Sequence, residues 1–240
     1  ISLAVAVIPE GLPAVVTLTL ALGVQAMRQR NVLIRRLAAS ETLGSVSVIA
    51  TDKTGTLTRN EMTVTRIYIP GQEFQVSGVG YRPVGEFMQD GQTVDPRSSE
   101  GLTALLRAVY LNSHATLTQD PPGILGSPTE GALVVAAHKA QLPILESPPP
   151  RVVWEFSFNS LRKRMTTVYD EGDRINAYMK GAPEVILPLC SRYREDGAVQ
   201  DLDGAARERF RSAYERFAAL GLRVLAVGCR TLPAGIEMEE

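Results

Sequence analysis

The chain is poor in cysteine and histidine, the residues that build disulfide frameworks and most zinc sites. Only Cys190, Cys229, His114 and His138 occur among 240 residues. The cysteines form no C-x-x-C pair and have no histidines near them in sequence, so neither a disulfide framework nor a zinc site is expected. We expect ordinary half-buried thiols. The two histidines fall in helical patterns without acidic or thiol partners and receive no functional role.

An excess of charge of one sign is also lacking, since 25 basic residues balance 26 acidic ones for a net charge of −1. The basic residues do not gather into a patch the size of a nucleic-acid groove, so no nucleic-acid partner is expected. Internal repeats and low-complexity tracts are absent as well. The glycines of residues 77–87 do not have G-x-G-x-x-G spacing, and no Walker loop occurs, which argues against both of these nucleotide motifs.

Residues 1–27 are mostly apolar, and Glu10 is the one charged side chain among them. A helix crosses a membrane with about 20 apolar residues, so this run predicts a transmembrane helix. It has no basic leader and no cleavage pattern, which argues against a signal peptide. Four arginines follow within residues 28–36 and favour a cytoplasmic location for the chain after the run. The run starts without an initiator methionine, so we expect a segment of a longer protein.

After the apolar run, the hydrophobic pattern changes period several times. Residues 14–42 have helical composition and are expected to continue the membrane helix as a polar stalk. The β-branched run "SVSVIA" predicts a buried strand that ends at Thr51, and a second strand is expected at 62–69. The glycine-rich stretch that follows has loop and hairpin chemistry.

Beyond residue 100, helical and strand patterns alternate, which predicts a mixed α/β domain. Helices are expected near 100–115, 128–140, 182–190 and 203–220. Strands are expected at 151–158, 164–170, 174–180 and 223–228.

The stretch "TDKTGTLT" at 51–58 carries the clearest chemistry. Asp52 directly follows the predicted strand, where open α/β sheets place reacting groups. A carboxylate in this position can attack the γ-phosphorus of a nucleotide and become an aspartyl phosphate, while turn donors and Mg²⁺ hold the phosphoryl oxygens. The structural alternative is an Asp-initiated turn made soluble by its threonines.

"DKTGTLT" is similar to the phosphorylation signature of P-type ATPases. The upstream "PEGLP" resembles the fourth transmembrane helix of the calcium-pump branch. Further stretches resemble the nucleotide-binding domain in the family's order: "GSPTEGAL" (126–133), "FNSLRKRMT" (158–166), "KGAPE" (180–184) and "GLRVLAVG" (221–228). The segment 77–87 also resembles the approach to that domain in bacterial pumps.

The resemblance implies an α/β fold made of consecutive parts. A transmembrane helix and stalk would occupy 1–44. The first part of a haloacid-dehalogenase-like Rossmannoid phosphorylation domain would occupy 45–69. An α+β nucleotide-binding domain with a mainly antiparallel sheet would occupy 70–232, and 233–240 would begin the return to the phosphorylation domain.

The resemblance also implies roles for residues of the phosphorylation turn. Asp52 would be the phosphorylated nucleophile, with Lys53 assisting the phosphate. Thr54 would offer its carbonyl to Mg²⁺ and its hydroxyl to the γ-phosphate, so Asp52 and Thr54 form the implied Mg²⁺ set.

In the nucleotide-binding domain, the resemblance implies that Phe158 stacks on adenine and Lys180 lines its pocket. Glu130 would accept a hydrogen bond from the base edge, and Lys163 and Arg223 would meet the phosphates or ribose. An aromatic face, cations and one acceptor suit an adenine nucleotide. Structural alternatives are a core position for Phe158, a solvated basic face at Lys163, and a first-turn helix carboxylate at Glu130.

One position departs from the family pattern. Ser160 stands where the calcium-pump branch often has an arginine, two residues after the stacking phenylalanine. Either Arg162 supplies the missing contact or the contact is absent.

Glu10 raises its own question, because a carboxylate at membrane depth needs a partner. Pro9 and Pro13 break the helix around it and free backbone carbonyls. Hard oxygen ligands at an unwound helix form a Ca²⁺-type site. The implied ligands of the transported cation are Glu10 with Val5, Ala6 and Ile8. The alternative is a kinked helix in which Glu10 is protonated or faces a water-filled gap.

Taken together, these motifs and the resemblance imply a fragment of an ATP-driven cation pump that uses ATP and Mg²⁺ and transports Ca²⁺. Its partners would be membrane lipid and the rest of the same polypeptide, with the soluble part in the cytoplasm. The alternatives are a soluble haloacid-dehalogenase-like phosphohydrolase and a non-catalytic nucleotide-binding module. Such phosphatases carry a second Asp two residues after the nucleophile, where this chain has Thr54. The family's "TGD", "GDGxND" and "TGE" motifs are missing, so the chain alone should bind ATP weakly and transport nothing.

Overall fold

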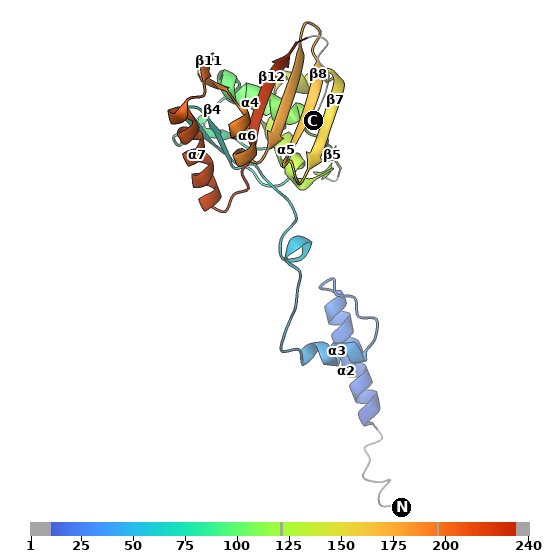
Figure 1. Cartoon of the computed structure of the whole chain (residues 1–240). Helices are drawn as coiled ribbons and strands as arrows, with labels where there is room; N and C mark the ends of the chain where they lie inside the picture. Colours follow the sequence, from blue (N-terminus) through green and yellow to red (C-terminus); the bar gives the residue numbers. More distant parts are fainter. Residues whose placement is uncertain (1–10, 121, 196, 234–240) are drawn as a thin grey trace, which may run out of the picture. The chain divides into compact units, whose positions relative to one another are not determined.

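A computed structural model of the chain describes residues 11–120, 122–195 and 197–233 (Figure 1). The chain divides into two compact units, Ile1–Arg59 and Asn60–Glu240. Domain boundaries are predicted after residues 44, 69 and 232, and the division between the two units falls between the first two of these positions.

The first unit contains the helices α2 (Leu12–Arg28) and α3 (Ala38–Gly44) and a short helical turn, η1 (Lys53–Leu57). The prediction of a continuous helix over 14–42 is wrong, because α2 ends at Arg28. Asn31 adopts a left-handed backbone conformation with φ of 62°. The amide of Val32 then donates to the carbonyl of Met27 at 3.1 Å, which closes the end of the helix.

The predicted membrane segment covers residues 1–27, and the structure describes it from residue 11 onward. Among the described residues, no helix combines the length and the apolar character needed to cross a membrane. Several apolar side chains of α2 are nevertheless exposed, including Val15 at 61% and Leu18 at 63%.

The predicted buried strand at "SVSVIA" does not form, so this expectation is wrong. The backbone of this stretch is irregular, and Val48 and Ile49 are largely exposed. A β segment needs a hydrogen-bonded neighbour. None of the strands found in the described part of the chain pairs with residues 45–51.

The second unit holds all the strands of the described chain and most of its helices. The first sheet runs in the order β1-β2-β3-β4, formed by Arg66–Ile69, Gln72–Val76, Phe87–Gln89 and Gln92–Val94. The second sheet runs in the order β12-β9-β8-β7, formed by Ala226–Leu232, Ile175–Gly181, Arg164–Asp170 and Arg151–Asn159.

Two small hairpins complete the strands. They pair β5 with β6 and β10 with β11, formed by Thr116–Gln119, Pro122–Leu125, Arg192–Glu195 and Ala198–Asp201. All strand pairs recorded in the described chain are antiparallel. The mainly antiparallel α/β architecture expected for this region is therefore confirmed.

The helices of the second unit are α4 (Glu100–Leu111), α5 (Pro128–Lys139), α6 (Pro183–Leu189) and α7 (Gly204–Ala219), with short turns η2 (Pro96–Ser98) and η3 (Pro143–Glu146). The positions of all four predicted helices are confirmed. The strands predicted at 151–158, 164–170 and 174–180 are confirmed too. The strand predicted at 223–228 begins later, at Ala226, and the one predicted at 62–69 begins at Arg66.

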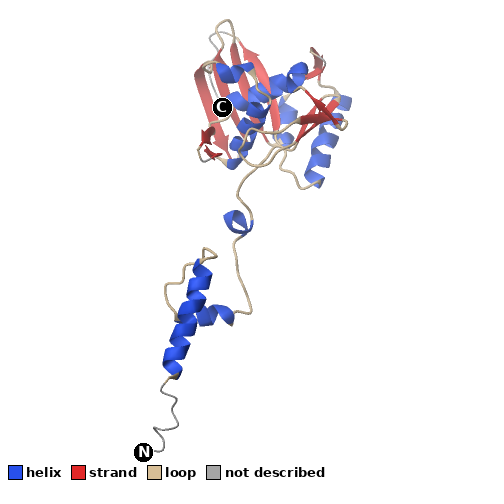
Figure 2. Ribbon diagram, turned by 180° about the vertical axis from the view of Figure 1, so that it is seen from behind, coloured by secondary structure: helices blue, strands red, loops and turns tan. Residues whose placement is uncertain are grey.

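Helices cover both faces of the β12-β9-β8-β7 sheet. Val227 packs against a cluster that includes Ala108 of α4, whereas a side chain added at Gly228 would meet Ile186 of α6. Adjacent strand residues point to opposite faces. Helices α4 and α6 therefore lie on opposite faces, and Figure 2 shows helices crossing the sheet when seen from behind.

The larger core cluster joins the β1-β2-β3-β4 sheet to α4 and α5. Its members include Phe74, Phe87, Leu102 and Leu106, each with 2% exposure or less. Leu102 and Leu106 lie one helical turn apart, which gives α4 one apolar face. Ser99 caps this helix by accepting a hydrogen bond from the amide of Leu102.

Candidate functional site

The β7–β8 hairpin presents an aromatic side chain to solvent. Phe158 is 64% exposed, so the alternative that it is a core residue is excluded in this structure. Its neighbour Asn159 shapes the turn by accepting hydrogen bonds from the amides of Leu161, at its side chain, and Lys163, at its carbonyl. Lys163 takes a left-handed conformation, with φ of 49°. Leu161, at the tip of the turn, is 91% exposed.

Lys180 and Glu130 form a largely buried ion pair. Lys180 Nζ lies 2.6 Å from Glu130 Oε1, and the two side chains are only 9% and 14% exposed. Lys180 also donates to the carbonyl of Asn112 and lies 3.5 Å from Ser113 Oγ. Burial lowers the pKa of Lys180, although the hydrogen bond and charge of Glu130 act in the opposite direction.

Glu130 reaches this pair from the first turn of α5. Ser127 caps the helix by accepting from the amide of Glu130 at 3.2 Å, and Pro128 occupies the first helical position. In a capping box the glutamate side chain would turn back to the cap. Here its carboxylate contacts Lys180 and accepts from the amide of His114 at 3.2 Å instead.

Strand register brings Phe158 toward Lys180. Met165 pairs with Lys180 across β8 and β9, and a register irregularity between Phe156 and Asn159 sets Phe158 opposite the same part of β8. Neighbouring strands are about 4.8 Å apart, so Phe158 and Lys180 are separated by roughly two strand spacings.

The hairpin turn is also held against the end of β9. The amide of Ala182 donates to the carbonyl of Lys163 at 3.0 Å. A Cβ at Gly181 would lie only 2.4 Å from that carbonyl, which explains the glycine in "KGAPE". Lys163 Nζ lies 3.4 Å from Glu184 Oε1, with both side chains more than half exposed.

The two remaining basic residues of interest also contact this region. Arg223 is exposed and donates to Thr129 Oγ1 at 3.2 Å, next to Glu130 in sequence. Arg162 donates to the carbonyl of Ser157 at 2.6 Å. Of the five predicted nucleotide residues, Glu130 and Lys180 contact each other directly. Phe158 and Lys163 lie on the hairpin that bonds to the end of β9, and Arg223 contacts Thr129, next to Glu130 in sequence.

Sequence reasoning missed three residues of this cluster. Asn112 is fully buried and donates to the carbonyls of Met165 and Tyr178, which fastens the end of α4 to the sheet. The expectation that His114 lies in a helix without an acidic partner is wrong, since its Nε2 lies 2.7 Å from Glu155 Oε2. A polar residue directly after an apolar helix was the only sequence signal for Asn112.

Glu155 joins the cluster from β7. Burial raises its pKa, but hydrogen bonds from Ser157 and His114 outweigh burial, so the pKa of Glu155 is lowered overall. The other histidine behaves as expected, because His138 Nδ1 bonds the carbonyl of Val134 within α5 at 2.9 Å.

The predicted phosphorylation residues form an exposed turn in the first unit. Asp52, Lys53 and Thr54 are all exposed, and the Asp52 carboxylate accepts from the amide of Thr54 at 3.4 Å. Gly55 has φ of 77°, a conformation that favours glycine. Thr58 Oγ1 donates to the carbonyl of Lys53 at 3.3 Å and so closes the turn.

The carboxylate of Asp52 and the oxygens of Thr54 are hard donors of the kind that Mg²⁺ takes. They fit part of a magnesium site. No group of three or more acidic, histidine or cysteine side chains in the described residues is arranged to hold a metal ion. The implied cation ligands Glu10, Val5, Ala6 and Ile8 lie outside the described residues.

Comparison with known proteins indicates the family of the chain. A family model described as P-type ATPase, cytoplasmic domain N, matches residues 101–239, which is more than half of the chain. The chain belongs to the P-type ATPase family. The matched range contains all five predicted nucleotide residues of this P-type ATPase chain, whereas Asp52 lies before it.

Named P-type relatives are similar over most of the chain. A cation-transporting ATPase, pma1, of Synechocystis sp. is 44% identical over 213 residues, which are 85% of this chain and 23% of that protein. A calcium-transporting ATPase of Bacillus subtilis is 42% identical over 203 residues, 82% of this chain and 23% of its own length. Calcium-transporting ATPase type 2C member 1 of Bos taurus is 41% identical over 202 residues, 82% of this chain and 21% of its length. The chain therefore spans less than a quarter of these relatives.

Proposed function

We propose that this chain is the ATP-binding and phosphorylated portion of an ATP-driven cation pump. The observation that carries the proposal is the buried Lys180–Glu130 pair, together with the exposed ring of Phe158 on the hairpin that bonds to the end of β9. Binding sites for small molecules combine apolar or aromatic walls with a few fixed polar groups.

In this proposal the base of ATP stacks on the exposed face of Phe158. Lys180 and Glu130 border the base, and the buried salt bridge fixes the position of both side chains. Lys163 and Arg223 are exposed, so both can also meet phosphate or ribose oxygens.

In this proposal Asp52 is the nucleophile that accepts the phosphoryl group. A carboxylate oxygen forms a bond to the γ-phosphorus, the bond from that phosphorus to the β,γ-bridging oxygen breaks, and ADP leaves with the electron pair. Mg²⁺ would neutralise charge on the phosphoryl oxygens, with Asp52 and Thr54 among its ligands. Lys53 would add a positive charge beside the same group. The complete activity requires the rest of the polypeptide.

We further propose Ca²⁺ as the transported cation, with the cytoplasmic side of a membrane as the location of the second unit. Two of the relatives above are named calcium-transporting ATPases, which supports this assignment. Glu10 and the carbonyls of Val5, Ala6 and Ile8 are the proposed ligands. Exposed apolar side chains on α2 suit contact with lipid or with further helices.

The test is titration of the 240-residue chain with ATP by calorimetry, comparing Phe158→Ala with Leu161→Ala. Loss of base stacking should weaken binding by about 1–3 kcal/mol in Phe158→Ala. Both side chains are exposed on the same hairpin, so neither change should alter stability by more than about 0.5 kcal/mol. Leu161→Ala should bind ATP as the original chain does. Equal affinity in all three chains would reject the stacking role.

A further inference from the structure

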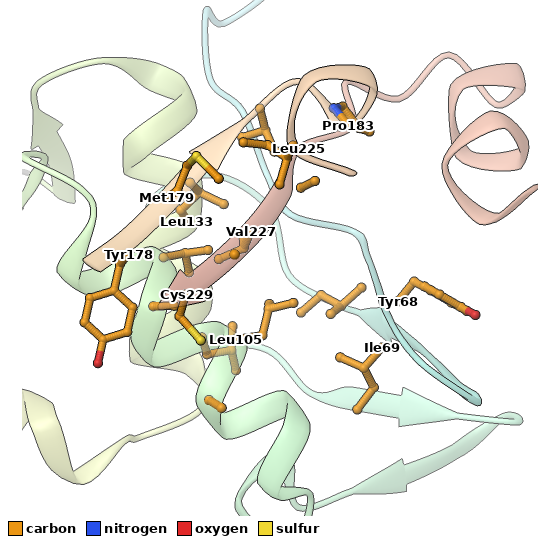
Figure 3. A pocket seen from close by; sticks show the side chains of 18 of the residues that line it. Tyr68, Ile69, Leu105, Leu133, Tyr178, Met179, Pro183, Leu225, Val227 and Cys229 are labelled. Atoms are coloured by element: carbon orange, nitrogen blue, oxygen red, sulfur yellow. The ribbon is translucent and has the colours of Figure 1, made fainter. Parts of the chain in front are cut away.

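The charged group around Lys180 is separate from the largest cavity of the second unit. That cavity measures about 1610 Å³, and Figure 3 shows Leu105, Leu133 and Val227 in its apolar lining. Lys180 and Glu130 do not line it. The electrostatics of the proposed nucleotide site are set by a different group of residues, which surrounds the Lys180–Glu130 pair.

A second carboxylate acts on this pair. Glu130 Oε1 lies 2.6 Å from Lys180 Nζ. Burial lowers the pKa of Lys180, and the negative charges of Glu130 and of Glu155 both oppose this lowering. Only 24% of the Glu155 side chain is exposed, so water screens its charge incompletely. One ammonium group thus interacts with two carboxylates, which leaves one negative charge in excess among the three side chains.

Strand register places Glu155 and Lys180 on one face of the sheet. Glu155 pairs with Thr167 across β7 and β8, and Met165 pairs with Lys180 across β8 and β9. Directly paired residues share a face, and so do residues two positions apart on one strand. The charge of Glu155 therefore acts on Lys180 without the sheet between them.

His114 contacts both carboxylates from the loop between α4 and β5. Its backbone amide donates to Glu130 Oε2 at 3.2 Å, and its ring nitrogen Nε2 lies 2.7 Å from Glu155 Oε2. Ser157 donates to the other oxygen of Glu155 at 2.6 Å, so that carboxylate is held from two sides. The side chain of His114 is 60% exposed and can exchange protons with solvent. A single residue thus connects the two carboxylates that act on Lys180.

Ionisable groups reach this region from several elements. They are Glu130 of α5, Glu155 of β7, Arg162 of the β7–β8 turn, Tyr169 of β8 and Lys180 of β9. Glu155 contacts the ring of His114, whereas Arg162 donates to the carbonyl of Ser157. Burial raises the pKa of Tyr169, and the charge of Glu155 raises it further, so this phenol stays neutral. Histidine is the side chain that ordinarily changes its charge between about pH 5 and 8.

We propose that His114 is a positioning residue of the nucleotide site and that its protonation strengthens ATP binding. A charged His114 neutralises Glu155, which removes the excess negative charge beside Lys180. ATP is an anion, so the site then repels it less. The inference rests on the proposed nucleotide site and adds its control by pH. By linkage, ATP must also favour the protonated form of His114, so binding takes up protons.

Calorimetric titration of the 240-residue chain with ATP at about pH 8 and about pH 6 tests the proposal, because these values bracket the usual titration of an imidazole. His114→Gln can still donate to Glu155 but carries no charge. Between the two pH values, the affinity of the original chain relative to His114→Gln should rise about two- to fivefold, the size expected for a partly exposed charge interaction.

His138→Gln is the matched control, because the other histidine bonds to the carbonyl of Val134 within α5. Its ATP affinity should respond to pH as that of the original chain does. The titration of ATP itself is common to all these chains and cancels in the comparison. In buffers of different ionisation enthalpy, the original chain should take up protons on binding ATP, and His114→Gln should take up fewer.

Glu155→Gln gives a second measurement that leaves His114 unchanged. Removing the negative charge of Glu155 should strengthen ATP binding at about pH 8 and reduce the response to pH, because His114 then has no charge to neutralise. Adenosine carries no phosphate. Its affinity for the original chain relative to His114→Gln should therefore be the same at both pH values.

Two results would overturn the inference while leaving the proposed function intact. One is an equal pH response of ATP affinity in the original chain and in His114→Gln. The other is a response to His114 protonation that is as large for adenosine as for ATP, because a neutral ligand is not repelled by the excess charge. A chain that binds ATP at neither pH rejects the proposed function and this inference together.

Discussion

Replacing Lys180 by methionine should destabilise the second unit strongly, because it leaves a buried carboxylate without its cation. Glu130 is 14% exposed and lies 2.6 Å from Lys180 Nζ. Removing one member of a buried ion pair costs about 3–5 kcal/mol. Glu130 keeps one donor, the amide of His114 at 3.2 Å, so the lower end of this range is expected.

The loss should be largely reversed when both partners are replaced by apolar side chains. A buried pair exchanged for apolar groups of similar size is often neutral. Lys180→Met combined with Glu130→Leu should therefore be more stable than Lys180→Met alone. Neither variant should bind ATP normally, which separates the structural role of the pair from its proposed role at the base.

Lys163→Met is the matched control. Lys163 also pairs with a glutamate, Glu184, but at 3.4 Å and with both side chains more than half exposed. Exposed pairs contribute about 0.2–1 kcal/mol, so its loss should be small. Its expected effect is on ATP affinity.

Urea unfolding followed by the fluorescence of Trp154 measures these differences, because the chain contains a single tryptophan and it lies on β7. Thermal unfolding followed with the same tryptophan gives a second measurement. A loss of 3 kcal/mol should lower the melting temperature by about 6–12 °C for a domain of this size. If Lys180→Met costs less than about 1 kcal/mol, the pair is not buried in the way described.

Three further outcomes are expected. In the full-length protein, Asp52→Asn should abolish an acid-stable, hydroxylamine-sensitive phosphoenzyme formed from γ-labelled ATP; label that persists would show another acceptor. Glu10→Gln should shift Ca²⁺-dependent phosphorylation to higher free Ca²⁺, whereas superimposable curves would show that Glu10 is structural. The folded-state pKa of Glu155 is lowered from 4.5, so its stabilising contribution is present above that pH and is lost as pH falls through the lowered value. Glu155→Gln should therefore flatten the acid side of the stability curve measured by urea unfolding, and an unchanged acid limb would contradict the pairing with His114.

The elements predicted most accurately are those whose sequence signals, such as helix caps and strand-favouring residues, are local. Helix α5 has a serine cap, a proline at its first position and small apolar residues along its length, and it forms where expected. Strand β8 contains Thr166, Thr167, Val168 and Tyr169, residue types that favour strands, and it forms where expected. Such signals depend on a few neighbouring residues, so no knowledge of the tertiary fold is needed.

The wrong predictions have non-local causes. "SVSVIA" has the composition of a buried strand, but no strand of the described chain lies beside it to accept its hydrogen bonds. The helix predicted across 14–42 fails at Asn31, one residue whose left-handed backbone ends α2. Asparagine is tolerated both within helices and at their ends, so its identity alone does not decide between the two.

The candidate site shows the same contrast between local signals and non-local contacts. Motif resemblance proposed Phe158, Lys180 and Glu130 as candidates, yet it gave no indication of what holds them in place. Their arrangement depends on the pairing of Met165 with Lys180 and on Asn112, which ties the end of α4 to two strand carbonyls. Asn112 and the strand carbonyls that it contacts are more than fifty positions apart in sequence. Such contacts follow from the register of the sheet rather than from any local pattern.

Glu130 does not bond back to its helix cap, and its pairing with Lys180 instead links helix α5 to strand β9. In the S-x-x-E pattern at the start of α5, a glutamate that bonded back to the cap would stabilise one helix end only. In this structure the serine alone caps the helix, and the glutamate carboxylate pairs with Lys180 on strand β9. That arrangement makes the position of Lys180 depend on α5 and on β9 together. A nucleotide that contacts both side chains would therefore depend on the packing of helix against sheet and on the pair itself. Lys180→Met should lose both stability and ATP affinity, whereas Lys180→Met combined with Glu130→Leu should regain stability without regaining affinity.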